Sequence, residues 1–203
     1  EGMSVVLVGR IEEKLQELGK NISETYGVDH MVIRADFAQS DCTDKIFEAT
    51  KDLDMGFMSY VACFHTFGKL QDTPWEKHEQ MINVNVMTFL KCFYHYMGIF
   101  AKQDRGAVIN VSSLTAISSS PYNAQYGAGK SYIKKLTEAV AAECESTNVD
   151  VEVITLGTTI TPSLLSNLPG GPAGEAVMKA AMTPEACVEE AFDNLGKSLS
   201  VIA

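Results

Sequence analysis

A tyrosine and a lysine stand four residues apart in the segment YGAGK, at Tyr126 and Lys130. In a helix, residues at this spacing lie on the same face, one turn apart. A lysine ammonium beside a phenol stabilises the phenolate, and lowering a tyrosine pKa from about 10 to about 7 takes about 4 kcal/mol of such stabilisation. The pair could therefore exchange a proton near neutral pH. It could equally be an amphipathic pair on an exposed turn.

A run of hydroxyl side chains precedes this pair, and Ser113 stands thirteen residues before Tyr126. A hydroxyl there could hydrogen-bond a carbonyl oxygen on which negative charge develops during reduction. The Tyr-x-x-x-Lys pair alone is weak, because a shuffled chain of this composition holds about 0.45 of them. Requiring a serine at one upstream position lowers that figure to roughly 0.03. The joint pattern favours carbonyl chemistry over a strand-end turn and a chance pair.

The composition of the 203-residue chain limits the function further. Hydrophobic residues make up 46% and charged residues 21%, which predicts one globular domain over residues 1–203. The formal net charge of -10 predicts that nucleic acid and anionic lipid are not partners. The five cysteines are odd in number and far apart, which favours reduced thiols and a cytoplasmic location.

Metal and membrane sites are not expected from the sequence. The histidines and cysteines lack the spacing of metal ligands, so each histidine is interpreted as a surface or packed imidazole. For His65, beside Cys63 at a strand end, contact with the cofactor or the substrate is the alternative. The most apolar stretch, 84–101, is interrupted by Lys91 and His95, which a lipid-facing helix would hold only at a high cost. We therefore expect a buried helix there and no membrane span.

Short runs rich in Val and Ile alternate with longer segments of helical period, which predicts strand–helix units and a parallel sheet. The predicted strands are 4–9, 31–35, 57–63, 107–112, 151–156 and 199–203. The predicted helices are 11–26, 42–52, 74–102, 123–147 and 183–195, and the fourth begins with the Tyr–Lys pair.

A Pro- and Gly-containing stretch of about 157–182 separates the last predicted helix from the strand before it. Its position is typical of a mobile lid over a substrate. The apolar residues of this stretch could contact a lipid-like, steroid-like or 3-oxoacyl substrate, or pack the lid on the body; they are Leu164, Leu165, Leu168 and Met178.

Three motifs together resemble the short-chain dehydrogenase/reductase family of NAD(P)-dependent oxidoreductases. They are NVN at 83–85, NVSS at 110–113 and YGAGK at 126–130, and the resemblance extends over nearly the whole chain. It implies a Rossmann-like α/β fold, with a doubly wound parallel sheet and a dinucleotide across the strand ends. It also implies a catalytic set of Asn85, Ser113, Tyr126 and Lys130.

The resemblance assigns a role to each member of this set. Ser113 would hydrogen-bond the substrate carbonyl, and Tyr126 would give or take the proton. Lys130 would also hold the nicotinamide ribose, so Tyr126 and Lys130 count among the cofactor-binding residues. Asn85 would lie behind Lys130 and help to organise a water-mediated proton path, although it could simply be a polar residue at a helix start.

Residues after the early strands indicate the cofactor. VGR places Gly9 where NAD-specific relatives usually have an acid, and Arg10 beside it could pair with a 2′-phosphate. NADP(H) is therefore favoured over NAD(H), unless Arg10 is an ordinary exposed arginine. Asp36 matches the family's acidic residue near the adenine, or is a turn aspartate.

Two further family motifs are present in altered form. The family's NNAG aligns with YVAC at 60–63, so that Ala62 is kept and Cys63 stands where glycine lets the cofactor come close. LGTTIT at 156–161 resembles PGxxxT, which assigns Gly157 and Thr161 to the nicotinamide and phosphate side. A glycine turn and a threonine cap at the start of the lid are the alternative.

The family's Gly-rich phosphate loop is not found in the sequence. The resemblance implies that the first strand and helix of the fold are absent from this chain, and that the natural protein is longer at its N-terminus. That strand would lie between the strands at 4–9 and 57–63, so we expect two strand edges that do not pair.

The sequence thus predicts an oxidoreductase that interconverts a ketone and a secondary alcohol on a small-molecule substrate, with Tyr126 as general acid/base. Because the family often pairs its long helices between subunits, we expect a homodimer or tetramer. One alternative is a catalytically weak or inactive relative that binds a nucleotide as a scaffold or sensor. Another is a cofactor-free interaction domain.

Overall fold

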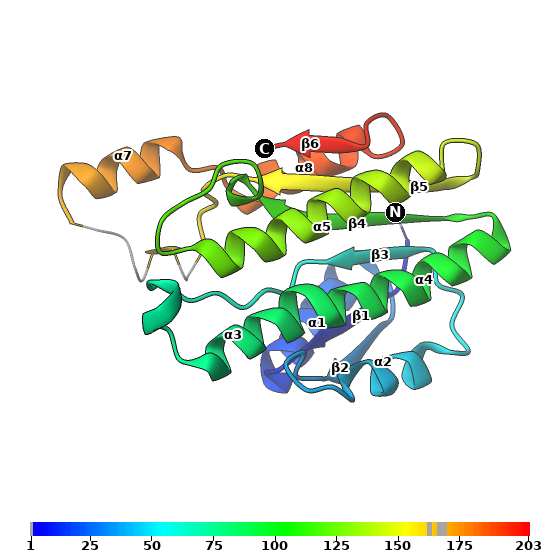
Figure 1. Ribbon diagram of the computed structural model, residues 1–203. Coiled ribbons are helices and arrows are strands. Elements are labelled where there is room, and N and C mark those ends of the chain that lie inside the picture. Colours follow the sequence, from blue (N-terminus) through cyan, green and yellow to red (C-terminus); the bar gives the residue numbers. More distant parts are fainter. Residues whose placement is uncertain (1, 162–163, 166–169) are drawn as a thin grey trace.

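The computed structural model describes residues 2–161, 164–165 and 170–203, and its strands form two parallel sheets (Figure 1). The larger sheet has the order β3-β4-β5-β6, and β1 pairs with β2 in the smaller one. The strands are β1 (Val5–Gly9), β2 (His30–Arg34), β3 (Phe57–Tyr60), β4 (Gly106–Ser113), β5 (Val149–Leu156) and β6 (Ser200–Ile202).

The edges of β1 and β3 do not pair with each other within the described residues. This is the arrangement expected if a strand of the family's sheet is missing between them. The strand observed at the predicted position 57–63 is shorter than predicted, because β3 ends at Tyr60. Val61 is 62% exposed, and the backbone beyond it leaves the sheet as a loop over residues 61–69.

Helices connect the strands as the periodicity predicts. They are α1 (Glu12–Tyr26), α2 (Cys42–Thr50), α3 (Trp75–Ile82), α4 (Phe89–Gln103), α5 (Ala124–Glu143), α7 (Pro172–Ala180) and α8 (Pro184–Asn194). The predicted helix 74–102 is interrupted by a π-helical segment, η2 (Asn83–Thr88), and α7 lies in the stretch predicted as a lid. Short 3-10 turns are present at η1 (Leu70–Asp72) and η3 (Leu114–Ala116).

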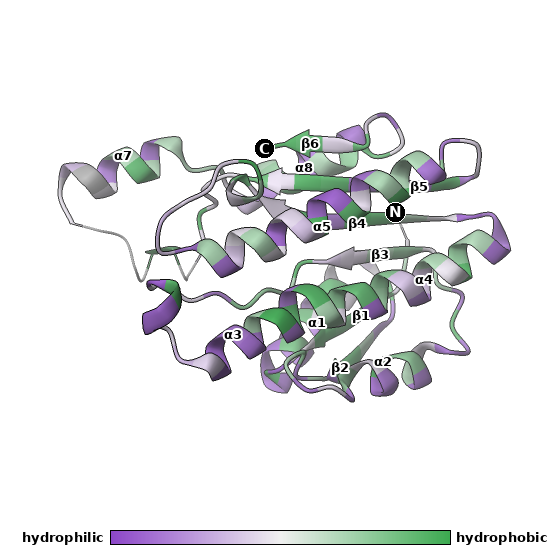
Figure 2. Ribbon diagram, viewed as in Figure 1, coloured by the Kyte–Doolittle hydropathy of each residue, from purple (hydrophilic) through white to green (hydrophobic). Residues whose placement is uncertain are grey.

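The two faces of the larger sheet are covered by different helices. Figure 1 shows α4 and α5 side by side across one face, with α8 behind the other. On the first face Val108 of β4 is fully buried in a core that includes Val151 of β5 and Ile133 of α5. On the second face Ile109 and Ile154 pack with α8. Figure 2 accordingly shows β4 and β5 as mainly hydrophobic strands, as expected where helices cover both faces.

Aromatic side chains hold the smaller sheet against the larger one. Phe37, which follows β2, stacks on Tyr60 of β3 with ring centroids 5.7 Å apart. Phe47 of α2 stacks on His95 of α4 at 3.8 Å. These contacts bring the carboxyl ends of β1, β2 and β3 to one edge of the molecule, where ligands bind in open α/β sheets.

Helix α4 is amphipathic. It buries Phe89 and Phe100 completely, whereas Tyr94 is 81% exposed. In the part of the chain that the structure describes, no helix combines the length and the apolar character needed to cross a membrane.

Candidate active site

Ser113, Tyr126 and Lys130 come together where β4 ends and α5 begins. The Ser113 hydroxyl is close enough to the Tyr126 phenol to lower its pKa. The Lys130 Nζ atom lies 5.8 Å from the centroid of the Tyr126 ring and donates a 2.8 Å hydrogen bond to the Val111 carbonyl oxygen. The structure thus unites the three groups that the sequence singled out, and their catalytic roles stay predictions.

The glycines of YGAGK let α5 approach its neighbours closely. A Cβ atom on Gly127 would lie 3.1 Å from the Thr115 carbonyl oxygen. A Cβ atom on Gly129 would lie 3.3 Å from the Asn85 Cβ atom. Both distances are shorter than an ordinary van der Waals contact. Small residues at these positions therefore set the distance of Tyr126 and Lys130 from η2 and from the end of β4.

The pKa of Tyr126 is raised, not lowered, in the chain without a bound nucleotide. Burial raises this pKa to about 12, the nearby Cys63 thiol adds to the rise, and the nearby Ser113 hydroxyl opposes it. Lys130 is 2% exposed, and burial lowers its own pKa. Burial is the largest influence on the pKa of the phenol in the chain without a bound nucleotide, and the expectation that Lys130 lowers this pKa stays a prediction. The phenol keeps its proton near neutral pH.

Asn85 lies on η2 and is fully buried. Its Oδ1 atom accepts a 2.8 Å hydrogen bond from the Phe64 N–H, and its Nδ2 atom donates a 2.7 Å bond to the Phe64 carbonyl oxygen. Asn85 therefore fixes the loop that follows β3. The sequence indicates Asn85 as part of a water path or as a polar residue at a helix start, and it does not predict these bonds to Phe64. The part of Asn85 in proton transfer stays a prediction.

Four of the predicted cofactor residues line one cavity of about 210 Å³. Arg10 follows β1, Asp36 follows β2, and Ala62 and Cys63 follow β3. The cavity is completed by Val8, Gly9, Ala35, Phe37, Phe64, Gln80 and Val84. Cys63 is also close enough to Tyr126 and Lys130 to affect both pKa values, so the cavity adjoins the Tyr–Lys pair.

The chemistry of this cavity fits one end of a dinucleotide. The Arg10 guanidinium matches the geometry of a phosphate, and the Asp36 carboxylate can accept hydrogen bonds from hydroxyl or amino groups. Asp36 Oδ1 already accepts a 3.1 Å bond from the Ala38 N–H, which fixes its orientation. The volume is below the roughly 300–1,000 Å³ of a complete small-molecule site, so this cavity accounts for part of such a ligand.

Gly157 and Thr161 do not line this cavity. The Gly157 N–H donates a 2.7 Å bond to the Ala203 carbonyl oxygen, at the end of β5. Thr161 Oγ1 accepts a 3.2 Å bond from the Leu164 N–H, which is the capping contact considered as the alternative. Their roles toward a cofactor stay predictions. Of the apolar lid residues, Leu165 is 53% exposed, and Leu168 lies outside the described residues.

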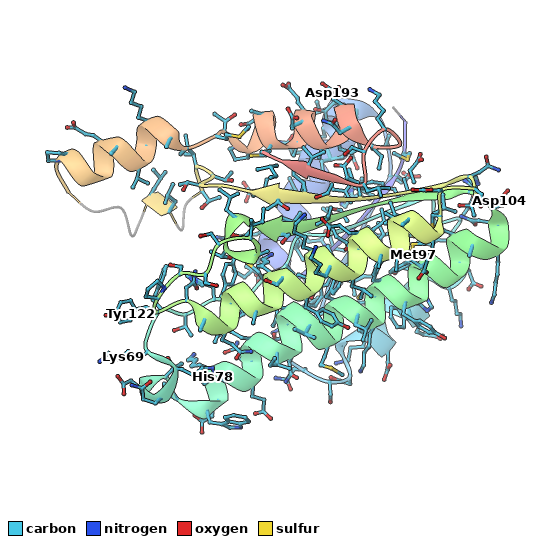
Figure 3. All side chains as sticks on the ribbon, turned by 45° about the horizontal axis from the view of Figure 1, so that its top comes forward. Lys69, His78, Met97, Asp104, Tyr122 and Asp193 are labelled. Carbon is cyan, nitrogen blue, oxygen red and sulfur yellow. The ribbon has the colours of Figure 1, made fainter. Side chains whose placement is uncertain are left out.

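The sequence indicates His65 as a surface or packed imidazole or as a contact to cofactor or substrate, and it does not indicate a contact with Tyr126. In the structure the His65 ring contacts Tyr126 edge to face, with centroids 4.6 Å apart. Its Nε2 atom lies 3.0 Å from Asn123 Oδ1, just before α5. Figure 3 shows Tyr122 beside Lys69, where the loop after β3 meets the turn before α5, and the Gly68 N–H donates a 2.9 Å bond to the Tyr122 carbonyl oxygen there. The available sequence signal was a polar ring two residues after Cys63, at a strand end.

No group of three or more His, Cys, Asp or Glu side chains that could hold a metal ion is found in the described ranges 2–161, 164–165 and 170–203. All five cysteines belong to these ranges, and each is free.

The fold is a Rossmann-like α/β fold, and Ser113, Tyr126 and Lys130 lie together near a cavity that is lined by residues following β1, β2 and β3. Residues 1–168 match the family model of the short chain dehydrogenases, and the chain belongs to this family. The family uses a nicotinamide cofactor.

Several proteins that are similar to this chain over its whole length are described as 7beta-hydroxysteroid dehydrogenases. A 7beta-hydroxysteroid dehydrogenase of Mediterraneibacter gnavus is 74% identical over 203 residues, which cover all of this chain and 77% of that protein. A 7beta-hydroxysteroid dehydrogenase of Collinsella aerofaciens is 74% identical over 202 residues, with the same two coverages. A solved structure described as giving insights into 7beta-hydroxysteroid dehydrogenase stereoselectivity is 74% identical and matches with a TM-score of 0.96 over 99% of this chain and 78% of that one.

The prediction of an enzyme is confirmed by these comparisons. The chain is a short-chain dehydrogenase that interconverts a hydroxyl group and a ketone with a nicotinamide cofactor. Neither the inactive scaffold nor the cofactor-free interaction domain is supported.

Proposed function

We propose that this chain is an NADP(H)-dependent hydroxysteroid dehydrogenase that interconverts a 7beta-hydroxyl group and the corresponding ketone. The observation that carries the proposal is the meeting of Ser113, Tyr126 and the buried Lys130 beside the cavity lined by Arg10 and Asp36. The steroid class rests on the names of relatives that are 74% identical over the whole chain.

The residues of this chain would act as follows in ketone reduction. The bound nicotinamide supplies the hydride in this direction and accepts it in the reverse one. The Ser113 hydroxyl hydrogen-bonds the substrate oxygen, on which negative charge develops. Tyr126 Oη gives its proton to that oxygen, and Lys130, the nearest ammonium, stabilises the phenolate that remains. A phenol with a pKa of about 12 is protonated near neutral pH and so is ready to donate.

Apolar side chains surround the proposed substrate entrance. Phe67 is 71% exposed beside His65, Tyr122 is 58% exposed on the turn before α5, and Leu114 is 43% exposed next to Ser113. They belong to three separate segments that meet near the phenol. Large exposed apolar side chains gathered at a polar site suit a rigid hydrocarbon skeleton that carries a hydroxyl or ketone.

Cofactor preference is assigned to Arg10, which follows β1 where no acid is present to repel a 2′-phosphate. Fluorescence titration with NADPH and NADH tests this preference. Steady-state assays with 7beta-hydroxysteroids, their 7alpha epimers and the 7-ketones then test the substrate class. Turnover of a 7beta-hydroxysteroid and of the ketone with NADP(H) is expected. Nucleotide binding without turnover of any steroid would refute the proposed function.

We also propose that residues 1–203 act as one oxidoreductase domain with a lid over about 157–182, and that the protein works in the cytoplasm. The absence of a disulfide among the five cysteines of the described residues supports that location. A homodimer or tetramer through the outer face of η2, α4 and α5 is supported by the exposure there of Met87 (45%), Tyr94 (81%) and Tyr132 (37%). Light scattering on the wild type and on Tyr94→Glu tests it, and a wild-type monomer would refute it.

A further inference from the structure

The imidazole of His65 is held from three directions next to the proton-exchanging phenol. Its ring meets Tyr126 at an interplanar angle of 65° and Phe67 at 81°, with centroids 4.6 Å and 4.3 Å away. On a further side, its Nε2 atom lies 3.0 Å from Asn123 Oδ1. Both ring contacts have the edge-to-face geometry that aromatic pairs prefer.

The partner amide is itself fixed. Asn123 is 7% exposed and directly precedes α5, the helix that carries Tyr126. A side-chain amide oxygen only accepts hydrogen bonds. Nε2 of His65 therefore carries a hydrogen and donates the hydrogen bond to Asn123 Oδ1. Within the described part of the chain, the Asn123 side chain makes no capping hydrogen bond to α5, so its contact with His65 can be tested separately from the helix start.

Other contacts hold the loop of His65 in place. Asn85 binds both backbone polar groups of Phe64, the preceding residue. The Gly68 N–H donates to the Tyr122 carbonyl oxygen on the other side of His65. Tyr122 has a φ of 64°, a left-handed conformation that non-glycine residues rarely adopt, and such strain tends to be kept where a local geometry matters.

We propose that His65 is a positioning residue: packed edge-on against the Tyr126 ring and bonded to the buried Asn123 amide, it sets the orientation of the phenol and shields it from water. The proposal rests on the proposed function, in which this phenol exchanges the proton. His65 is assigned no direct part in proton transfer, because its Nε2–H group is engaged in the hydrogen bond to Asn123.

The electrostatic setting agrees with this role. Burial lowers the pKa of His65, against a smaller rise from the bond to Asn123, so the imidazole is neutral near pH 7. Tyr126 is the titratable side chain that its ring contacts, and Cys63 and Lys130 are the further titratable groups near the phenol. A neutral ring contributes shielding rather than charge. Burial is the main cause of the high pKa of Tyr126, so removing the imidazole should lower that pKa.

Three variants separate shielding from a general structural role. His65→Ala removes the ring, His65→Phe keeps a ring of similar shape without the hydrogen bond, and Asn123→Ala removes the amide alone. In steroid oxidation, His65→Ala should lower kcat roughly tenfold. It should also move the rising limb of the kcat–pH profile about one pH unit lower, with the Kd for NADPH unchanged. His65→Phe should keep the limb of the wild type, and Asn123→Ala should lie between the two.

A second measurement is independent of turnover. With 3-fluorotyrosine at position 126, fluorine NMR follows the ionisation of this phenol without steroid or nucleotide. The phenol pKa should be about one pH unit lower with His65→Ala than with His65, and unchanged with His65→Phe.

Equal phenol pKa values in the wild type, His65→Ala and His65→Phe would overturn the proposal. A kcat for His65→Phe as low as that of His65→Ala would also overturn it. If His65→Ala does not fold, His65→Gln replaces it, because it removes the ring but can keep the bond to Asn123, and the same shift is expected. Failure of the proposed function would appear differently, as a wild type without steroid turnover that still shows the fluorine NMR shift.

Discussion

Glu152 gives the sharpest test of the energetics of the fold. It lies in β5 opposite Ile109 of β4, and its side chain is fully buried. Neither carboxyl oxygen has a hydrogen-bond partner among the described residues. Burial, with a further contribution from the charge of Glu190 on α8, raises the pKa of Glu152 to about 7. We predict that Glu152→Gln stabilises the protein in a pH-dependent manner.

The sign and the size follow from proton binding. In the unfolded chain this carboxyl has a pKa of about 4.5, so the folded state binds the proton more tightly. Ionisation therefore favours unfolding as the pH rises from about 4.5 to about 7, and the effect is complete above pH 7. The interval between the two pKa values corresponds to about 3 kcal/mol. The glutamine amide has no charge to lose, so the variant should gain about 3 kcal/mol at about pH 8 and about 2 kcal/mol at about pH 6.

Urea unfolding at these two pH values, followed by circular dichroism, measures the two gains. Glu189→Gln is a matched control, because Glu189 is an exposed carboxylate on the same helix, α8, and its replacement should change the free energy of unfolding by less than about 0.5 kcal/mol. A gain for Glu152→Gln that does not vary with pH would refute the reasoning. A loss of stability at about pH 8 would refute it more strongly.

Three further predictions test the site and the core. Arg10→Glu should weaken NADPH binding at least tenfold and leave NADH binding nearly unchanged, measured by fluorescence titration; equal losses for both nucleotides would contradict the assignment. Lys130→Met should lower kcat about 100-fold or more in steady-state assays, because it removes the nearest ammonium, and a kcat near that of the wild type would contradict this role. Phe100→Ala should cost about 3–5 kcal/mol in urea unfolding, against less than about 1 kcal/mol for the exposed Tyr94→Ala; similar costs for both would contradict the packing described for α4.

Much of the fold could be predicted because its signals are local. The β-branched runs predicted strands β1 to β6, and the helical period predicted the helices that cover them. The π-helical segment Asn83–Thr88 was not predicted, because the residue pattern of 74–102 is that of one continuous helix; in the structure this segment packs closely against α5 at Gly129. Helix α7 was missed because the Pro- and Gly-containing segment before it is typical of a loop.

The sequence predicted which residues come together in the candidate site, but not the direction in which their pKa values shift. Spacing alone placed Tyr126 above Lys130 on one helix face and indicated a nearby Ser113. It could not show that Lys130 is buried and Tyr126 partly buried, and burial is the largest influence on the pKa of the phenol. His65 could not be predicted either, since its contact with Tyr126 depends on how the loop after β3 packs against the start of α5.

The central claim is that the Tyr126 phenol exchanges the proton in steroid oxidation and reduction. The most direct test compares the wild type with Tyr126→Phe in the conversion of a 7beta-hydroxysteroid to its ketone, after both proteins are shown to bind NADPH equally well. The variant should lose about 100-fold to 10,000-fold in kcat, because it keeps the ring and loses only the phenol oxygen that accepts the substrate proton in this direction. Turnover by Tyr126→Phe at the rate of the wild type would contradict the claim.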